Sequence, residues 1–387
     1  MTGVYIVGGD HHNGYGLARH FGANGVDVYS IVISDRKKSW LSKSKYIKKS
    51  YIFSCVNDAF DYLENANNSE KALIIPYSDA AALELDNRIK RLRDNYIFPS
   101  FKEVPGKICT YMDKMVQYNI ARNNNIPVAY SEAIDLYKLG NQWPDIYPCI
   151  VKPQVSAEGK KSDITVCYNQ DQLTETIDRL RKEKYKKLII QEFIDFEYEI
   201  DAFGAIDNGK ILSIFPHKIL RRWPSIGGTC SYTQAIVDEK IIKFCKVILD
   251  VVCEQGYSGL YDLELFFHNG KLYFNELNYR CSGSSFRSLG QHFYYVYDWY
   301  NSKISGKTFN QISVPSKKTY SMTEYTDFRH ILNGEITFCR WIKDFKKSSC
   351  FSLLCTNDLK PIIFKVIYSI GGRNDKTNYF ISSITND

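Results

Sequence analysis

The sequence predicts an α/β domain followed by α+β domains. Over the first hundred residues, short β-rich runs such as VYIVGG (residues 4–9) and VDVYSIVIS (residues 26–34) alternate with helical patterns. Such alternation is typical of an open parallel sheet. Later in the chain, Asn208-Gly209 and Asn269-Gly270 each separate two β-rich runs, and this dipeptide is a strong hairpin signal. Antiparallel hairpins beside helices indicate α+β domains.

A chain of 387 residues is long enough for two or three domains. We expect an N-terminal α/β domain over residues 1–108 that binds substrate. A second unit is expected over residues 109–300, with a lid subdomain at about 145–192. Residues 301–387 form a C-terminal extension in which no motif indicates a role.

Composition excludes several classes of protein. Hydrophobic residues make up 44% and charged residues 24%, as in ordinary globular proteins. No apolar run approaches the roughly 20 residues of a membrane helix, and the N-terminus does not resemble a signal peptide. Eleven scattered cysteines without a C-x-x-C motif fit reduced thiols and predict a cytoplasmic protein. The net charge of +7 is partly concentrated in residues 35–51, which we interpret as a solvated loop, so no nucleic-acid partner is expected.

Acidic and amide side chains converge on one predicted hairpin. Counting outward from Asn269-Gly270 places Glu264 and Glu276 roughly opposite one another, and Asn278 points to the same face as Glu276. Two carboxylates and an amide oxygen suit a hard cation such as Mg²⁺. The alternative is a pair of exposed carboxylates that repel across the ladder.

Lysines precede this hairpin in the chain. Lys152 ends the apolar run CIVKP, where it could clamp phosphate beside a metal ion or simply extend to solvent from a sheet edge. The following turn, residues 155–162, contains Lys161 and could close over phosphates, although it lacks a Walker pattern.

Two further segments carry polar groups at strand ends. Backbone groups of Glu192, Phe193 and Ile194 could pair with an adenine edge, with Glu199 accepting from ribose hydroxyls; a polar loop between strands is the alternative. Lys218 and Arg221 lie in a cationic stretch before Gly227-Gly228. That stretch suits a developing negative charge, or an ordinary exposed turn.

Short polar runs follow predicted strands of the N-terminal domain. Open α/β sheets bind ligands at the carboxyl ends of their strands, so we expect substrate near these runs. They contain Asp10, His11, Asn13, Ser78 and Asp79. Asp10 and Asp79 could instead cap helices, each worth about 1 kcal/mol.

The order of these parts resembles the ATP-grasp superfamily, over about residues 1–300. The most specific piece is Asn-Glu-Leu-Asn-x-Arg, residues 275–280; the start of the chain looks like carboxylate–amine ligases near D-aspartate ligase. The resemblance implies an ATP-grasp fold in which two α+β subdomains clasp ATP. It implies two Mg²⁺ ions, for which Mn²⁺ could substitute, on Glu264, Glu276 and Asn278. Lys114 and Lys152 would contact phosphates.

The implied reaction is ATP-dependent formation of an amide. A carboxylate is activated as an acyl phosphate and attacked by an amine, such as an amino acid, with release of ADP and phosphate. Arg280, Arg221 and Lys218 would act at the catalytic end, since guanidinium groups match planar oxyanions. The acid and amine, either small molecules or polymer precursors, stay unidentified, and so does the oligomeric state, a homodimer included.

Two other functions compete with this one. Gly14, Gly16 and Asp35 imitate the fingerprint of an NAD(P)-dependent oxidoreductase, but the third glycine is missing. A noncatalytic nucleotide-binding module is the other, and the intact Glu264, Glu276, Asn278 and Lys152 argue against it.

Overall fold

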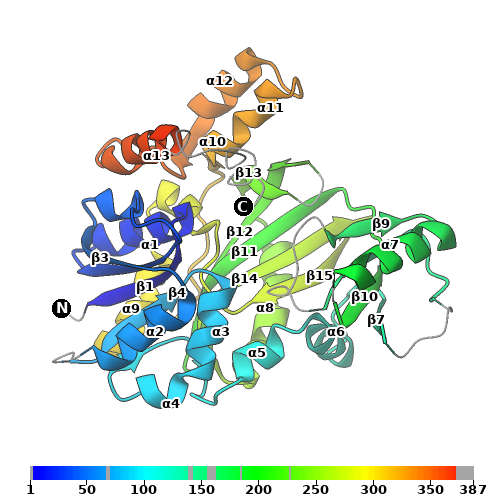
Figure 1. The fold of residues 1–387 in the computed structure, drawn as a ribbon, viewed down its shortest axis with the longest axis horizontal. Coiled ribbons are helices and arrows are strands. Elements are labelled where there is room, and N and C mark those ends of the chain that lie inside the picture. Colours follow the sequence, from blue (N-terminus) through cyan, green and yellow to red (C-terminus); the bar gives the residue numbers. More distant parts are fainter. Residues whose placement is uncertain are drawn as a thin grey trace.

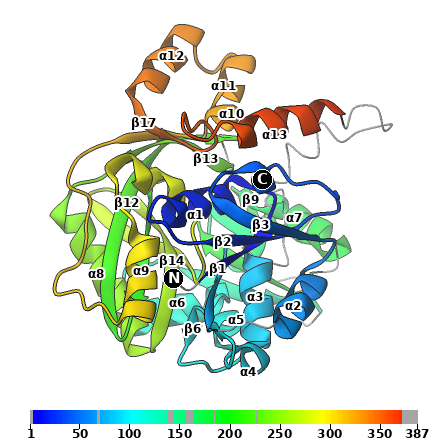
Figure 2. The same ribbon diagram turned by 90° about the vertical axis from the view of Figure 1, so that its left-hand side faces the viewer.

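The computed structural model describes residues 3–66, 70–137, 143–154, 163–183, 185–225 and 228–371, which form three β-sheets and the helices around them. Figures 1 and 2 show the N-terminal sheet and the small sheet on either side of a long, curved sheet. Among the described residues, every helix is too short or too polar to cross a bilayer.

The N-terminal sheet is parallel, as the sequence predicts, with the strand order β3-β2-β1-β4-β5. Its faces are covered by helices, so its central strands are apolar on both sides. Val4 and Ile6 face a core shared with Leu17 of α1, whereas Val7 faces a core shared with Phe60 of α2. The elements are β1 (Val4–Gly9), α1 (His12–Gly22), β2 (Val28–Ile33), η1 (Leu41–Lys43), β3 (Ile47–Phe53), α2 (Val56–Asn65), β4 (Ala72–Pro76), α3 (Asp79–Asn87), α4 (Ile89–Leu92) and β5 (Tyr96–Ile97).

The small sheet is antiparallel, in the order β7-β10-β8-β9, and α7 packs on it through an apolar core that includes Leu173 and Ile177. It contains residues of the segment expected to be a lid, about 145–192, and its first strand begins earlier, at Ser131. The elements here are α5 (Lys107–Tyr111), α6 (Lys114–Asn123), β7 (Ser131–Asp135), β8 (Cys149–Pro153), β9 (Thr165–Cys167), α7 (Gln170–Lys182) and β10 (Lys187–Glu192).

The large sheet has the order β15-β14-β11-β12-β13-β16-β17, and β6 (Ser100–Phe101) pairs with β14. Both predicted hairpins form: Asn208, Gly209, Asn269 and Gly270 all have positive φ, as tight hairpin turns require. The elements are β11 (Tyr198–Asp207), β12 (Lys210–Trp223), β13 (Thr229–Ala235), α8 (Glu239–Glu254), β14 (Tyr257–His268), β15 (Lys271–Asn278), η4 (Ser285–Gln291) and α9 (Tyr295–Ser305).

The C-terminal segment is integrated into the fold, which the sequence did not indicate. Its strands extend the large sheet beyond β13, and its helices lie above the N-terminal sheet in Figure 1. The elements are β16 (Tyr320–Met322), α10 (Glu324–Asp327), α11 (Arg329–Leu332), α12 (Phe338–Lys347), β17 (Ser348–Phe351) and α13 (Lys360–Gly371).

The glycines that imitate a dinucleotide fingerprint lie inside α1 rather than in a loop before it. A Cβ on Gly14 would lie 2.8 Å from atoms of Leu41 and Tyr77, and one on Gly16 would lie 2.9 Å from Ser285 Oγ. These glycines therefore allow close packing of α1, and the structure gives no support to the oxidoreductase alternative.

Candidate active site

A cleft of about 1590 Å³ lies where the three sheets and the C-terminal segment meet. It brings together most of the side chains that the sequence singled out. The predicted residues that line it are His11, Asn13, Asp79, Lys114, Lys152, Glu192, Phe193, Ile194, Glu199, Lys218, Arg221, Glu264, Glu276, Asn278 and Arg280. Asp10 and Ser78 do not line it, and Lys161 lies outside the described residues.

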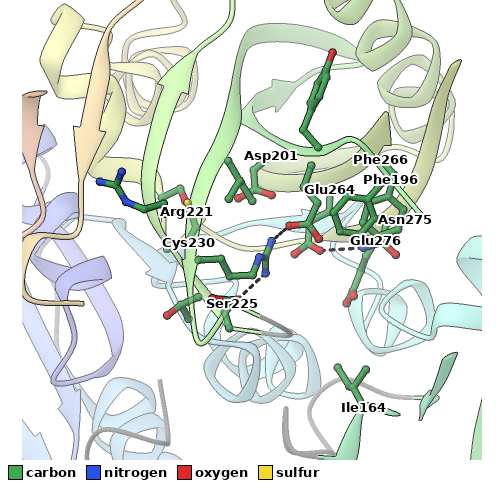
Figure 3. Close-up of a pocket in the computed structure, with 18 of the residues that line it drawn as sticks. Ile164, Phe196, Asp201, Arg221, Ser225, Cys230, Glu264, Phe266, Asn275 and Glu276 are labelled. Carbon is green, nitrogen blue, oxygen red and sulfur yellow. Dashed lines mark hydrogen bonds and ion pairs between the residues drawn. The ribbon is translucent and has the colours of Figure 1, made fainter. Parts of the chain in front are cut away.

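An acidic cluster forms the floor of the cleft. Glu264 on β14 is the register partner of Glu276 on β15, as counting from the turn predicts. Asn275 is the extra residue of a bulge beside this pair, and its Nδ2 donates to Glu264 Oε2 at 3.1 Å (Figure 3). Burial, and then the charge of Glu276, raise the pKa of Glu264 to about 8. Two facing carboxylates in a buried site fit a divalent cation, because such an ion removes their repulsion.

Two aspartates join this cluster, and sequence reasoning did not assign them a role. Asp262 is the register partner of Asn278, and Asp201 on β11 is the register partner of Glu264. Both line the cleft. The sequence could have indicated Asp262, because it lies two residues before Glu264, and residues two apart in a strand share one face.

The lysines lie beside the carboxylates. Lys114, in the first turn of α6, places its Nζ 3.2 Å from Glu276 Oε1. Lys152 on β8 is buried and donates to Gln191 Oε1 at 2.9 Å. Burial, and then the positive charge of Lys114, lower the pKa of Lys152 to about 8. A buried ammonium whose charged form is disfavoured in this way is suited to binding an anion.

Part of the cleft beside the acidic cluster is apolar. Phe196 and Phe266 stack at a centroid distance of 4.7 Å next to Glu264, and Ile164 lines another part of the cleft (Figure 3). The segment Glu192–Ile194 leaves β10 and also lines the cleft, and the Phe193 N–H donates to Pro148 O at 3.0 Å. Apolar side chains beside exposed strand-end backbone suit a planar heterocycle.

Glu199 and Lys218 also line the cleft, and Glu199 is the register partner of Phe266. The Glu199 carboxylate pairs with Arg222, whose Nη1 also donates to Gly228 O at 2.6 Å. Lys218 Nζ lies 3.6 Å from the centroid of the Tyr198 ring, a cation–π contact.

Both arginines that the sequence assigned to substrate are held by carboxylates. Arg280 donates to Asp79 at 2.6 Å and to Asp262 at 2.9 Å. Arg221 donates to Asp327 at 2.8 and 3.0 Å and to Asp344 at 2.6 Å. These contacts satisfy the guanidinium groups within the chain, so the geometry favours a positioning role for both.

The predicted substrate residues divide into two groups. The Asp10 carboxylate accepts from Ser39 Oγ at 2.6 Å and from the backbone of η1, and Ser78 Oγ accepts from Ala81 N at the start of α3. Ser78 therefore caps α3, whereas Asp10 joins the end of β1 to the start of η1. Asn13 and His11 face the cleft at the N-terminus of α1, with His11 Nδ1 2.6 Å from Asn13 Oδ1.

Arg287 on η4 was missed by sequence reasoning. Its side chain is 2% exposed yet lines the cleft, and it donates to Thr233 Oγ1, Thr323 Oγ1 and backbone carbonyls. Among the described residues, no carboxylate pairs with it, and its Nε has no hydrogen-bond partner. A buried cation with neutral neighbours attracts an anionic ligand. Nothing in the sequence around Arg287 distinguishes it from the other arginines.

Residues 119–291 match the family model described as the ATP-grasp domain. Formate-dependent phosphoribosylglycinamide formyltransferases are among the relatives. The one from Wolinella succinogenes is 28% identical over 139 residues, covering 35% of this chain and 34% of the relative. The one from Prochlorococcus marinus strain NATL1A is 28% identical over 287 residues, covering 72% and 64%. The chain thus spans about a third to two thirds of the length of these relatives.

The fold has counterparts among solved structures. N5-carboxyaminoimidazole synthetase from Staphylococcus aureus, complexed with ADP, superposes with a TM-score of 0.63 at 13% identity, covering 87% of this chain and 86% of that one. These comparisons support the predicted superfamily but not D-aspartate ligase in particular. Residues 119–291 are thus similar to the ATP-grasp domain, and the chain has the ATP-grasp fold.

Proposed function

We propose that this protein is an ATP-dependent ligase that activates a carboxylate by phosphoryl transfer and joins it to an amine. The observation that carries the proposal is the buried pair Glu264–Glu276 with Lys114 and Lys152 beside it, in the cleft of an ATP-grasp fold. Phosphoryl transfer needs positioning and charge neutralisation more than acid–base chemistry, and these residue types supply both.

Each group of residues in the cleft has a proposed role. Glu264, Glu276 and Asn278 would hold two Mg²⁺ ions, which neutralise charge on the phosphates. Lys114 and Lys152 would bind phosphate oxygens. The backbone of Glu192–Ile194 would meet the adenine edge, and the stacked Phe196 and Phe266 would flank that edge. Glu199 would accept from a ribose hydroxyl while Arg222 holds its carboxylate in place.

The substrate would bind between the acidic floor and the N-terminus of α1. Arg287 is the strongest candidate for holding a carboxylate or acyl phosphate, because its charge has no acidic partner among the described residues. Lys218 adds a second cation on β12. The N-terminus of α1, where His11 caps the Asn13 N–H, would orient the anion together with the Asn13 side chain. Arg280 and Arg221 would position these elements through their carboxylate partners.

The substrate class follows from the chemistry and from the names of the relatives. Those proteins are formate-dependent and are named for phosphoribosylglycinamide, which favours a small carboxylate and a phosphorylated amine over a free amino acid as the amine. An amino acid or a polymer precursor is the second candidate. A cytoplasmic location and a homodimer stay predictions from the sequence.

Hydroxylamine trapping tests the proposal directly. The full chain is incubated with ATP, Mg²⁺, hydroxylamine and one carboxylate at a time, beginning with formate and continuing through amino acids. We expect equal amounts of hydroxamate and ADP with the cognate acid, because hydroxylamine intercepts an acyl phosphate. ADP release without hydroxamate for every acid would contradict carboxylate activation, and NAD(P)H binding without ATP binding would contradict the ligase altogether.

A further inference from the structure

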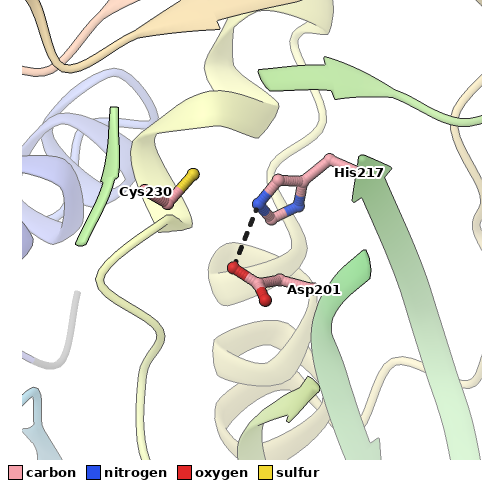
Figure 4. A group of neighbouring side chains, drawn as sticks. All are labelled: Asp201, His217 and Cys230. Carbon is pink, nitrogen blue, oxygen red and sulfur yellow. Dashed lines mark ion pairs between the residues drawn. The ribbon is translucent and has the colours of Figure 1, made fainter. Parts of the chain in front are cut away.

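A second cluster of ligand-type side chains lies on the wall of the cleft. Asp201 on β11 and His217 on β12 are register partners, and Cys230 comes from β13. The ligand atoms of the three side chains all lie within 4.8 Å of one another. Figure 4 shows the Asp201 carboxylate and the Cys230 sulfur both facing the His217 ring. Register shifts in β12 at Ile219/Arg221 and Arg221/Arg222 bend this ladder, because bulges kink a strand.

His217 is the reason to expect a ligand here. Its side chain is 0% exposed, and within the described part of the chain neither ring nitrogen has a hydrogen-bond partner. Its Nε2 lies 3.6 Å from Asp201 Oδ2, which is too far for a hydrogen bond. A buried imidazole without a hydrogen bond is costly, so this group calls for a ligand.

Burial raises the pKa of the Cys230 thiol to about 11, so a bound cation would have to displace its proton. Arg287 Nη2 donates to Cys230 Sγ at 3.2 Å, and its positive charge opposes this rise. Cys230 and Asp201 both line the cleft, so an ion could enter from it.

We propose that Asp201, His217 and Cys230 form a three-ligand site for Zn²⁺, with a fourth position open to the cleft. Nitrogen, sulfur and one carboxylate are the ligands that Zn²⁺ prefers, and three protein ligands plus an open position is the usual arrangement of a reactive zinc site. Tetrahedral ligation places the donor atoms roughly 3.3 to 3.6 Å apart. The separation of His217 and Asp201 already has this value.

This site differs from the acidic cluster in chemistry, although Asp201 is the register partner of Glu264. Glu264 and Glu276 offer oxygen ligands alone, which suit Mg²⁺. The histidine and cysteine select a softer ion. The zinc site does not depend on the ligase reaction, because its ligands and its test require no nucleotide.

Cobalt binding to the full chain tests the proposal. The protein is stripped with a chelator, desalted and titrated with Co²⁺ in the presence of excess Mg²⁺, which keeps the acidic cluster occupied. We expect one equivalent of Co²⁺ to give a thiolate-to-cobalt charge-transfer band and the intense visible bands of tetrahedral cobalt, all bleached by one equivalent of Zn²⁺. Wild-type protein without a thiolate band would overturn the proposal, whatever the variants do.

Matched variants locate the ligands. Cys230→Ser and His217→Asn should remove the band or weaken Co²⁺ binding at least tenfold, whereas Cys339→Ser, an exposed cysteine on α12, and His268→Asn should leave both unchanged. Thermal melting in chelator shows whether each variant is folded. A band that survives in folded Cys230→Ser would place the cobalt on another of the chain's eleven cysteines and overturn the assignment.

Discussion

Arg280, two residues beyond the end of β15, donates its Nε–H to Asp79 in the first turn of α3 over 2.6 Å. This ion pair joins the large sheet to the N-terminal domain beside the cleft. The second carboxylate, Asp262, accepts from Arg280 Nη1. Burial lowers the pKa of the Arg280 guanidinium, but the two carboxylates raise it by more, so the net shift is upward.

Arg280→Gln should lower the free energy of unfolding by about 3 kcal/mol, because it leaves two partly buried carboxylates without a cation. Asp79→Asn should cost less, since Arg280 keeps Asp262. Urea unfolding measures both, and the affinity for ATP should change little. Unchanged stability together with a hundredfold loss of turnover would return Arg280 to the catalytic role that the sequence suggests.

Arg221→Gln should loosen the C-terminal segment. Arg221 pairs with both Asp327 on α10 and Asp344 on α12, so its loss removes the ion pairs that the structure describes between these helices and β12. Hydrogen exchange should speed up over residues 324–347. Arg340→Gln is the matched control, because Arg340 is exposed and reaches only Asp344, and it should change exchange far less. Equal exchange in the two variants would show that Arg221 does not anchor this segment.

The sequence predicted the strands, the hairpin turns and the Glu264–Glu276 pairing because these features depend on local patterns. Period-two alternation fixes which side chains share a face, and Asn-Gly fixes the turn from which residues are counted. These signals need no knowledge of distant segments.

The features that the sequence did not predict depend on contacts between segments that are far apart in the chain. Arg280 meets Asp79 across 201 residues, and Arg221 meets Asp344 across 123, so nothing local shows that either guanidinium is already paired. Arg287, Cys230 and His217 carry no local signal either, since each becomes informative only where η4, β13 and β12 meet. Likewise, β16 and β17 are too short for their patterns to show that they extend the large sheet.

The affinity for ATP should depend on pH through Lys152. In the free protein its pKa is about 8, whereas phosphate favours the charged form. Below pH 8 the ammonium is present before binding; above pH 8 binding must take up a proton, so affinity should fall by about tenfold per pH unit. Calorimetry with a non-hydrolysable ATP analogue measures this. Lys152→Gln should bind more weakly with a flatter profile, and Lys187→Gln, exposed on β10, should keep the wild-type profile. A flat wild-type profile would place the phosphates elsewhere.

Substitutions of Asn13 and Ser78 should distinguish a residue that binds substrate from one that caps a helix. Asn13→Ala should raise the KM for the carboxylate or the amine by about tenfold and leave the KM for ATP unchanged, because Asn13 faces the cleft at the start of α1. Ser78→Ala should lower the free energy of unfolding by about 1 kcal/mol and leave every KM unchanged, because Ser78 only caps α3. If Ser78→Ala raises a substrate KM while Asn13→Ala does not, the substrate lies over α3 instead.

Mg²⁺-dependent turnover of Glu276→Gln tests the central claim most directly. ADP and hydroxamate formation are followed as Mg²⁺ is raised to saturation, with Glu239→Gln, an exposed glutamate on α8, as the matched control. Glu276→Gln removes one of the two facing carboxylates. We predict that turnover falls at least a thousandfold at every Mg²⁺ concentration, while thermal melting in chelator stays close to that of the wild type and Glu239→Gln keeps full activity. Near wild-type turnover of Glu276→Gln at saturating Mg²⁺ would contradict the account.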